Sequence, residues 1–336
     1  MNKKSIITIL LGLIGIVSMS SAVVAFSYIN SVGPITKSSW RLQITTFCFF
    51  ISVLLTLKEN SSKYLSHLKT YYKRITMSGF SIGGHFILWN ISMEYTSIAH
   101  SLLFLYSCPI LLVFYYFTIK KSLKKLQILG ALIGFAGLSL MCFMSNTSEG
   151  TTWYGDLISL SGALVLCINL VLSESPMSDS PLMYLFSIHF IASIFCSVLS
   201  AIVEPEDSSN LLAFLYEFQG VYAVYLGVVC GFIGNGAFYY LLKRVNPFIV
   251  SVIINFDPVV GSLFAWGFGF LENPGLFTYI GGALVVFGNL IATSSSNPNN
   301  EVGSNESNSP EENNSPTYTI QIKNASEGIN ETAQIN

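Results

Sequence analysis

Polar side chains inside long apolar segments are the residues of this chain that could do chemistry. Between residues 247 and 267, four residues repeat with the spacing i, i+4, i+7, i+11, which places them on one face of a helix. They are Ser251, Asn255, Pro258 and Ser262. In the preceding apolar segment, Asn235 and Tyr239 are i, i+4 neighbours. Hydroxyl and amide groups in such surroundings either hydrogen-bond a polar solute or bond one another between helices.

A related set occurs in the first half of the chain. Pro109 and Pro258 are 149 residues apart, and this offset needs no gap through the two preceding apolar segments. Each proline frees a carbonyl and can kink its helix. We therefore expect polar residues of both halves to line a solute cavity, with hydrogen bonding between helices as the alternative. The expected solute contacts are Asn90, Tyr106, Asn235, Tyr239, Ser251 and Asn255.

Three ionisable residues in apolar segments are candidates for a coupling or structural role. Asp257 is the only acid predicted deep in a segment, beside the face of Asn255 rather than on it. It either carries a coupling proton or pairs with a neighbour. For Arg41, near the outer end of its segment, snorkelling of the guanidinium to the interface is favoured over binding a solute carboxylate. His85 is expected to be a packed, hydrogen-bonded residue rather than a proton relay.

Common catalytic and metal-binding motifs are missing from the sequence. It contains no P-loop, GxSxG or HExxH motif. Its six cysteines lie in apolar stretches without CxxC or Cys/His spacing, which is typical of packing residues. We therefore predict no catalytic residue, metal, cofactor or nucleic-acid partner, and ATP-driven transport by this chain is disfavoured.

The composition predicts an integral membrane protein. Of the 336 residues, 51% are apolar and 10% are charged, against about 25% charged in soluble domains. About 20 apolar residues span a bilayer as a helix, whose backbone satisfies its own hydrogen bonds in lipid. Apolar blocks between charged or turn-rich breaks predict ten spans, at about 5–28, 38–57, 75–93, 98–117, 126–144, 155–173, 181–203, 220–242, 247–267 and 275–293.

The two ends of the chain differ in composition. Lys3 and Lys4 precede an apolar run that reaches Ala22 to Ala25, a pattern that also fits a cleavable signal peptide. Because this run continues to about Ile29, we expect a membrane span instead. Residues 294–336 are rich in Asn, Ser, Glu and Pro, which predicts a disordered tail.

The basic residues predict the orientation. With the N-terminus in the cytoplasm, 14 of the 16 Lys and Arg residues fall in cytoplasmic segments, and only Lys37 and Arg41 fall on the far side. This is the bias expected for cytoplasmic loops. One span more or fewer would scramble it, so the charges favour ten spans with both termini in the cytoplasm. Whether the membrane is the plasma membrane or an endomembrane stays open.

Several short motifs occur in a fixed order in both halves. Residues 84–101 end in the corner Tyr95-Thr96-Ser97-Ile98-Ala99-His100-Ser101, and Pro109 and a glycine-rich segment at 130–137 follow it. In the second half, Asp257-Pro258 and Gly281-Gly282 repeat the scheme. In this order and spacing the chain resembles the drug/metabolite transporter superfamily, EamA-like branch. The acid that this family often has after the fourth span is replaced by lysine here, and its counterpart remains only as Glu272.

The resemblance implies an all-α integral membrane protein of ten transmembrane helices in two inverted five-helix repeats, at residues 1–145 and 146–293. Five spans per repeat turn the second repeat upside down, as in carriers that alternate access around a midplane site. The implied function is a membrane carrier for a small organic solute, either a metabolite or a drug-like molecule. Its partners are the solute and the lipid bilayer, and the oligomeric state stays open.

Three alternatives to this function are kept. A nucleotide-sugar or sugar-phosphate transporter of the same superfamily needs Arg or Lys in its cavity, whereas Arg41, Lys243 and Arg244 are near helix ends. A membrane-embedded acyl transferase using His85 or His100 lacks a nucleophile or acid–base set. A non-transporting regulatory protein would use the tail for docking. Solute counterflow in proteoliposomes separates the carriers from the other two classes.

Overall fold

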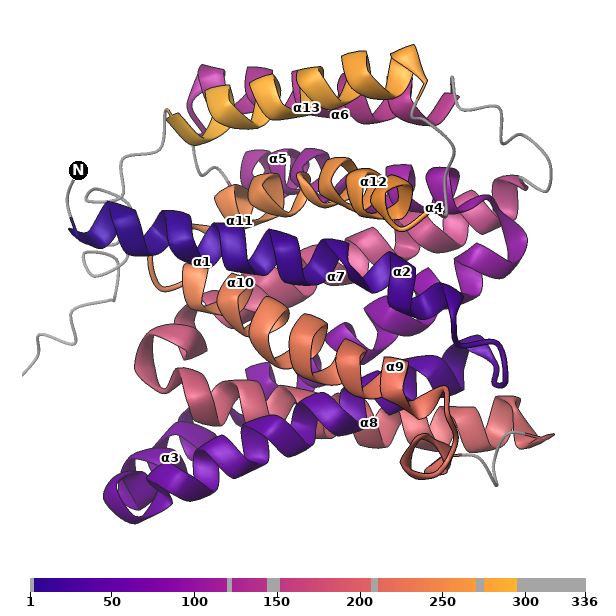
Figure 1. The fold of residues 1–336 in the computed structure, drawn as a ribbon. Helices are drawn as coiled ribbons and strands as arrows, with labels where there is room; N and C mark the ends of the chain where they lie inside the picture. The colour runs from indigo at the N-terminus through magenta and orange to yellow at the C-terminus, as the bar shows by residue number, and fades with distance from the viewer. Residues whose placement is uncertain (1–2, 120–122, 144–151, 207–210, 270–274, 295–336) are drawn as a thin grey trace, which may run out of the picture.

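The computed structural model describes residues 3–119, 123–143, 152–206, 211–269 and 275–294. All regular structure in these residues is helical (Figure 1). Nine helical stretches in this part are long and apolar enough to cross a membrane. Glu272 and the expected tail from residue 295 onward lie outside the described residues. The predicted all-helical membrane fold is confirmed.

The helices follow the apolar blocks of the sequence. The first half contains α1 (Lys3–Ser20), α2 (Ala22–Ser27), α3 (Pro34–Tyr95), α4 (Ile98–Leu105), α5 (Cys108–Thr118) and α6 (Lys125–Phe143). The second half contains α7 (Trp153–Asp179), α8 (Pro181–Val203), the 3-10 turn η2 (Ala213–Leu215), α9 (Gly220–Tyr225), the π-helix η3 (Leu226–Asn235), α10 (Gly236–Leu241), α11 (Pro247–Ile254), α12 (Asp257–Gly267) and α13 (Leu276–Ser294).

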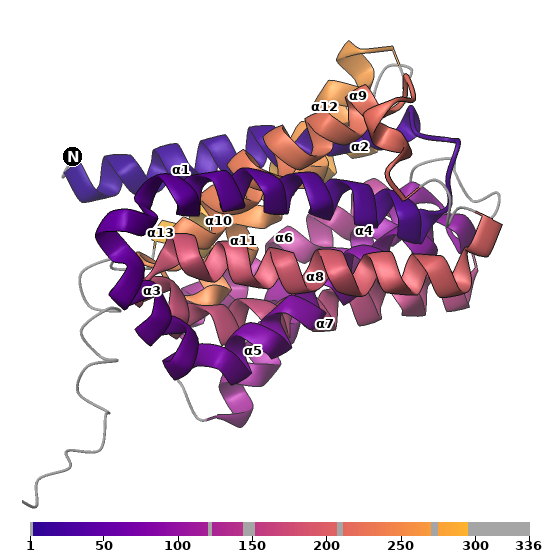
Figure 2. The same cartoon turned by 90° about the horizontal axis from the view of Figure 1, so that it is seen from below.

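The long helix α3 contains two of the predicted spans. The side-chain amide of Asn90 donates to Ser38 Oγ at 2.7 Å, across 52 residues of sequence. A straight helix would place these residues about 78 Å apart. The helix α3 must therefore bend and return beside itself, as its ribbon does in Figures 1 and 2. Together with the eight other stretches, it gives an arrangement consistent with ten passes.

The two halves repeat the same helix pattern. The helices α4 and α5 have 8 and 11 residues, and so do α11 and α12. Each bound of the second pair equals that of the first pair plus 149, so that Ile98 corresponds to Pro247 and Thr118 to Gly267. This is the offset that the two prolines predict.

The last helices of the two halves run antiparallel. The helices α6 and α13, each the last of its half, lie side by side at the top of Figure 1. A Cβ atom at Gly130 would lie 2.4 Å from the Gly288 carbonyl oxygen, and one at Gly137 would lie 2.5 Å from that of Gly281. Residues later in α6 therefore contact residues earlier in α13, so the two helices run in opposite directions. Antiparallel equivalent helices are the arrangement of an inverted repeat.

The fourth and ninth spans differ from the prediction, because each is broken into two helices. The first break lies at Tyr106 and Ser107, and the second lies at the equivalent Asn255 and Phe256. Pro109 and Pro258 follow in the first turn of the new helices. A proline there needs no N–H partner, but its ring disfavours helical backbone in the residue before it. Both broken spans therefore present a turn near their middle.

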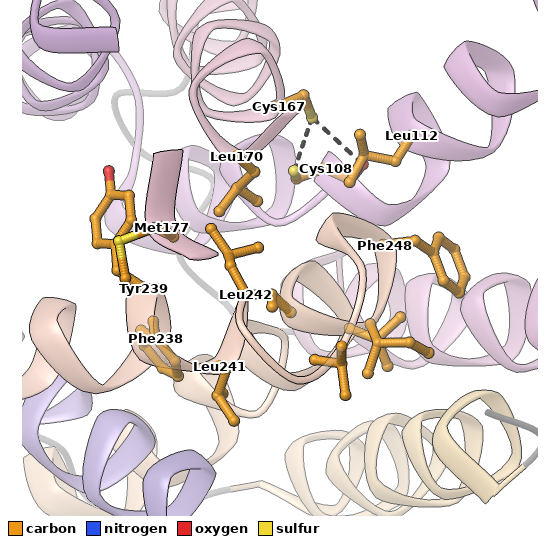
Figure 3. Packing of buried hydrophobic residues seen from close by; sticks show 14 of the residues in the cluster. Cys108, Leu112, Cys167, Leu170, Met177, Phe238, Tyr239, Leu241, Leu242 and Phe248 are labelled. Atoms are coloured by element: carbon orange, nitrogen blue, oxygen red, sulfur yellow. Dashed lines mark hydrogen bonds between the residues drawn. The ribbon is translucent and has the colours of Figure 1, made fainter. Parts of the chain in front are cut away.

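The two larger of three apolar clusters in the described residues hold most of the bundle together. One cluster joins α5, α7, α8, α10 and α11, and Figure 3 shows Leu112, Leu170 and Leu241 among its members. The second cluster joins α2, α3, α4, α8 and η3 and includes Trp40 and Trp89, which are at most 6% exposed. A contiguous apolar interior of this kind, in a protein whose outer surface is also apolar, is expected of a membrane bundle.

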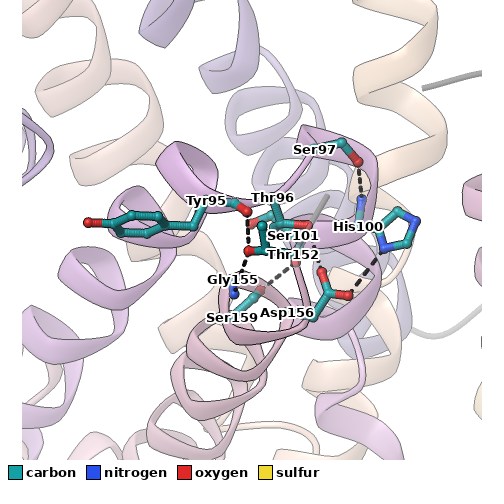
Figure 4. Close-up of polar contacts among 9 residues, drawn as sticks. All are labelled: Tyr95, Thr96, Ser97, His100, Ser101, Thr152, Gly155, Asp156 and Ser159. Atoms are coloured by element: carbon teal, nitrogen blue, oxygen red, sulfur yellow. Dashed lines mark hydrogen bonds and ion pairs between the residues drawn. The ribbon is translucent and has the colours of Figure 1, made fainter. Parts of the chain in front are cut away.

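The corner at residues 95–101 joins the first half to the second (Figure 4). The Thr96 hydroxyl donates to the Asp156 carboxylate of α7 at 2.7 Å, and His100 Nδ1 lies 3.3 Å from the other oxygen of that carboxylate. Ser159 Oγ, one turn along α7, donates to the Ser101 carbonyl oxygen at 2.5 Å. The polar residues of this motif thus fix α4 to the first helix of the second half.

Candidate functional site

A cavity of about 60 Å³ lies between the two halves. It adjoins both apolar clusters, because its walls include members of each. The volume exceeds the ~10–15 Å³ that a single water molecule requires. Apolar and aromatic side chains form most of the wall. The polar side chains on it are His85, Tyr106, Asn235, Tyr239 and Asp257, all of which the sequence analysis singles out.

Asp257 connects the two halves across this cavity. Ser20 Oγ, at the end of α1, donates to one carboxylate oxygen at 2.5 Å, and the Tyr106 hydroxyl donates to the other. Asp257 itself begins α12, where the partial positive charge of a helix N-terminus favours an acid. We expected this acid beside the cavity-facing side of Asn255. The structure instead places Asp257 on the wall and Asn255 off it.

His85 lies on the cavity wall and is held by a backbone contact. Its Nδ1 lies 3.2 Å from the Gly162 carbonyl oxygen of α7. Because a carbonyl oxygen only accepts, Nδ1 carries the hydrogen in this contact, and the other ring nitrogen of a neutral imidazole is an acceptor. His85 therefore offers an acceptor from α3.

Tyr239 is positioned by a buried network that sequence reasoning missed. Its hydroxyl donates to Asn169 Oδ1 of α7, and Asn169 Nδ2 in turn donates to Ser78 Oγ at 2.7 Å. The hydroxyls of Tyr184 and Ser173 complete the network at 2.7 Å from each other. Asn169 is a single amide in an apolar block, which was the only signal in the sequence. The Tyr239 hydroxyl is already satisfied, so its ring is what it presents to the cavity.

The π-helix η3 carries Asn235 to the wall. A Cβ atom at Gly231 would lie 1.8 Å from Thr45 Oγ1, and one at Gly227 would lie 2.4 Å from Ile44 Cβ. Glycine therefore lets η3 approach α3 at these two positions. Such π-helical segments are frequent at functional sites. Asn235 Nδ2 is buried without a hydrogen-bond partner among the described residues, so it leaves a free donor at the cavity.

Three expected solute contacts lie off this wall. The side chain of Asn90 bonds Ser38 within α3, and Ser251 Oγ donates to the Phe248 carbonyl oxygen of its own helix at 2.7 Å. Asn255 is 2% exposed, and its Oδ1 has no partner in the described part of the chain. The structure therefore brings together five of the nine polar and ionisable candidates.

The snorkelling interpretation of Arg41 is wrong. Arg41 is 1% exposed, and its guanidinium carbon lies 4.3 Å from the centre of the Phe86 ring. Arg41 is seven residues beyond Pro34, the first residue of α3, which is about 10 Å along the helix. It faces the interior of the bundle from there. The side chain is thus stacked inside the bundle rather than extended to the interface.

Three comparisons place the chain among known proteins. A model of the EamA-like transporter family matches residues 6–143 and 153–294. An uncharacterized transporter of Buchnera aphidicola subsp. Schizaphis graminum (strain Sg) is 25% identical over 201 residues, which cover 59% of this chain and 63% of the relative. The match thus spans less than two thirds of that relative's length. A protein of known crystal structure superposes with a TM-score of 0.68 at 18% identity, covering 85% of this chain and 96% of the other.

Proposed function

The chain belongs to the EamA-like transporter family, and from this premise we propose that it carries a small organic solute across the membrane by alternating access. The solute would occupy the cavity between the halves. Asn235 Nδ2 and the free ring nitrogen of His85 would be its polar contacts. The rings of Tyr106 and Tyr239 would pack on it.

One observation carries the proposal, namely that the polar wall is shared between the halves. Tyr106 lies at the break between α4 and α5, and it bonds Asp257 at the start of α12. Rocking of one inverted half against the other changes the distance between these residues. Access to the cavity would therefore change together with the contacts made inside it.

The charges around the cavity support a small solute over a nucleotide sugar. Phosphate groups bind most strongly to Arg or Lys in direct contact. Lys243 and Arg244 follow the end of α10, and neither lines the cavity. We further propose that both termini are cytoplasmic, because 14 of the 16 basic residues fall on that side in the ten-pass order.

Thermal stabilisation followed by counterflow tests this proposal. Purified protein would be screened against a panel of metabolites, because a bound ligand raises the stability of the folded state by RT ln(1 + [L]/Kd). Solutes that stabilise the protein would then be followed as label exchange across proteoliposomes. Exchange that requires unlabelled solute inside the vesicles is the expected result. Binding without exchange for every stabilising solute would contradict the carrier function.

A matched pair of variants tests the site itself. Asn235→Leu removes the unpartnered donor on the wall, and Asn255→Leu makes the same chemical change off the wall. We expect the first variant to lose ~1–3 kcal/mol of solute affinity, the cost of one missing hydrogen bond partner. The second should retain its affinity. Equal losses in the two variants would show that the solute does not occupy this cavity.

A further inference from the structure

Arg41 is a buried charge that lacks an acceptor. Its Nε and Nη1 have no hydrogen-bond partner among the described residues. Its Nη2 donates to Met19 Sδ at 3.3 Å, and a thioether is a weak acceptor. A guanidinium cannot lose its proton in a protein. A permanent charge at 1% exposure with two unused nitrogens is unfavourable unless an anion reaches it.

Asp257 does not supply that anion. Arg41 and Asp257 interact electrostatically, yet no Asp or Glu oxygen of the described chain lies within 4.0 Å of the guanidinium. Both oxygens of Asp257 are already bonded by the hydroxyls of Ser20 and Tyr106. Arg41 and Asp257 are therefore held by different neighbouring side chains and do not form an ion pair.

The guanidinium lies one side chain behind the cavity wall. Phe86, which stacks on it at 4.3 Å, and Met19, which it contacts, both line the cavity. Stacking on Phe86 fixes the plane of the guanidinium by a cation–π contact. Met19 is the flexible element of this barrier, because methionine has three rotatable bonds and adapts its shape readily. A rotation of Met19 would open Arg41 to a group inside the cavity.

We infer that Arg41 forms a subsite for a carboxylate, and that the transported solutes are small organic carboxylates. This inference rests on the proposed carrier function. A carboxylate supplies the acceptors that Nε and Nη1 lack, and its charge offsets the guanidinium. Apolar walls formed by Ile82, Leu105 and Leu166 surround the rest of the solute. A phosphate fits less well, because Arg41 is the one cation beside the cavity in the described chain.

Matched acids and amides test the subsite on the wild-type protein. The probes are 4-methylpentanoate, 4-methylpentanamide, leucine, leucinamide and inorganic phosphate, with phenylacetate and phenylacetamide as a second pair. The full chain in detergent is unfolded by heat in the presence of each probe. We expect the acids to raise the unfolding midpoint and the amides of the same shape to leave it unchanged. Stabilisation by amides as large as by acids, by phosphate alone, or by no acid would overturn the inference.

Two substitutions then locate the subsite. Arg41→Gln should weaken acid binding by about tenfold or more, since it removes a charged partner. The unliganded stability should change little, because relief of a buried charge without an ion-pair partner offsets the loss of its contact with Phe86 and its attraction to Asp257. Arg244→Gln, three residues beyond α10 and off the cavity wall, is the control and should bind acids normally. If Arg41→Gln does not fold, Arg41→Lys keeps the charge and should still bind acids more weakly. Unaltered acid affinity in the folded variant would assign the carboxylate elsewhere.

Failure of the subsite and failure of the carrier function are distinguishable. If an amide or another neutral solute shows counterflow and no acid does, the carboxylate subsite is wrong and the carrier function is retained. If acids bind tightly and no bound solute shows counterflow, the carboxylate subsite is retained and the carrier function is wrong.

Discussion

The glycine contact between α6 and α13 gives a sharp test of the fold. In Gly130→Ala, the new Cβ atom would lie 2.4 Å from the Gly288 carbonyl oxygen and 2.5 Å from the Ala292 nitrogen. A carbon and an oxygen approach to about 3.3 Å without strain, so the two helices must separate by about 1 Å here. Forced overpacking costs ~1–3 kcal/mol, whereas Gly→Ala within a helix gains ~0.5–1 kcal/mol. The expected net loss is about 1 kcal/mol, within a range of ~0–2.5 kcal/mol.

The matched control is Gly282→Ala, a glycine of α13 that faces α12 instead of α6. There the new Cβ atom would meet Val259 Cγ1 at 3.5 Å, an ordinary contact, so only the helix-propensity gain applies. The unfolding free energies of both purified variants would be measured in detergent by the same denaturant titration. We expect Gly282→Ala to match or exceed the wild type and Gly130→Ala to fall below it. If Gly130→Ala is as stable as Gly282→Ala, the described crossing of α6 and α13 is wrong.

Three other predictions concern polar contacts and topology. Tyr239→Phe leaves Asn169 Oδ1 buried without its donor and should lower the unfolding free energy by ~1–3 kcal/mol; an unchanged value would argue against the network. Asp156→Ala removes the acceptor of Thr96 at the corner between the halves, and a loss of similar size is expected in the same titration. A protease site after residue 336 should be cut only from the cytoplasm and one near Asp207 only from the other side. Cleavage of both sites from one side would exclude the three passes that the proposed order places between them.

The helices could be predicted from apolar blocks, and in places to the residue. The block at 181–203 coincides with α8 (Pro181–Val203). The loop expected at about 58–74 is helical instead and forms the bend of α3. This segment contains neither Gly nor Pro, so no residue in it interrupts a helix. Hydropathy predicts which residues lie in the membrane, and it does not predict where a helix ends. The offset of 149 residues between the two halves was visible in the sequence because a proline constrains the backbone at its position, whereas most other residue types do not.

The candidate site could be predicted only in part, because periodicity gives the faces of one helix and not their partners. The predicted face with Asn255 assumes one continuous helix over residues 247–267. The turn at Asn255 and Phe256 interrupts that helix, and Asp257 therefore lies on the cavity wall. Asn169 is the one amide of its apolar block, and Ser20 is one of three serines within residues 18–21. Both were missed because only a bonding partner far away in sequence identifies their role. The π-helix η3 was missed because its glycines indicate close packing without indicating the hydrogen-bond pattern.

The contact between α6 and α13 also has a consequence for biosynthesis. The helix α6 ends at Phe143 and α13 ends at Ser294, so a ribosome adds about 150 residues between the two, which takes roughly 8–30 s at ~5–20 residues per second. During this interval the glycine face of α6 has no native partner in its own chain. A neighbouring nascent copy that had released its α13 could occupy that face and give a dimer with exchanged helices. Slow translation of the second half would lengthen this exposure.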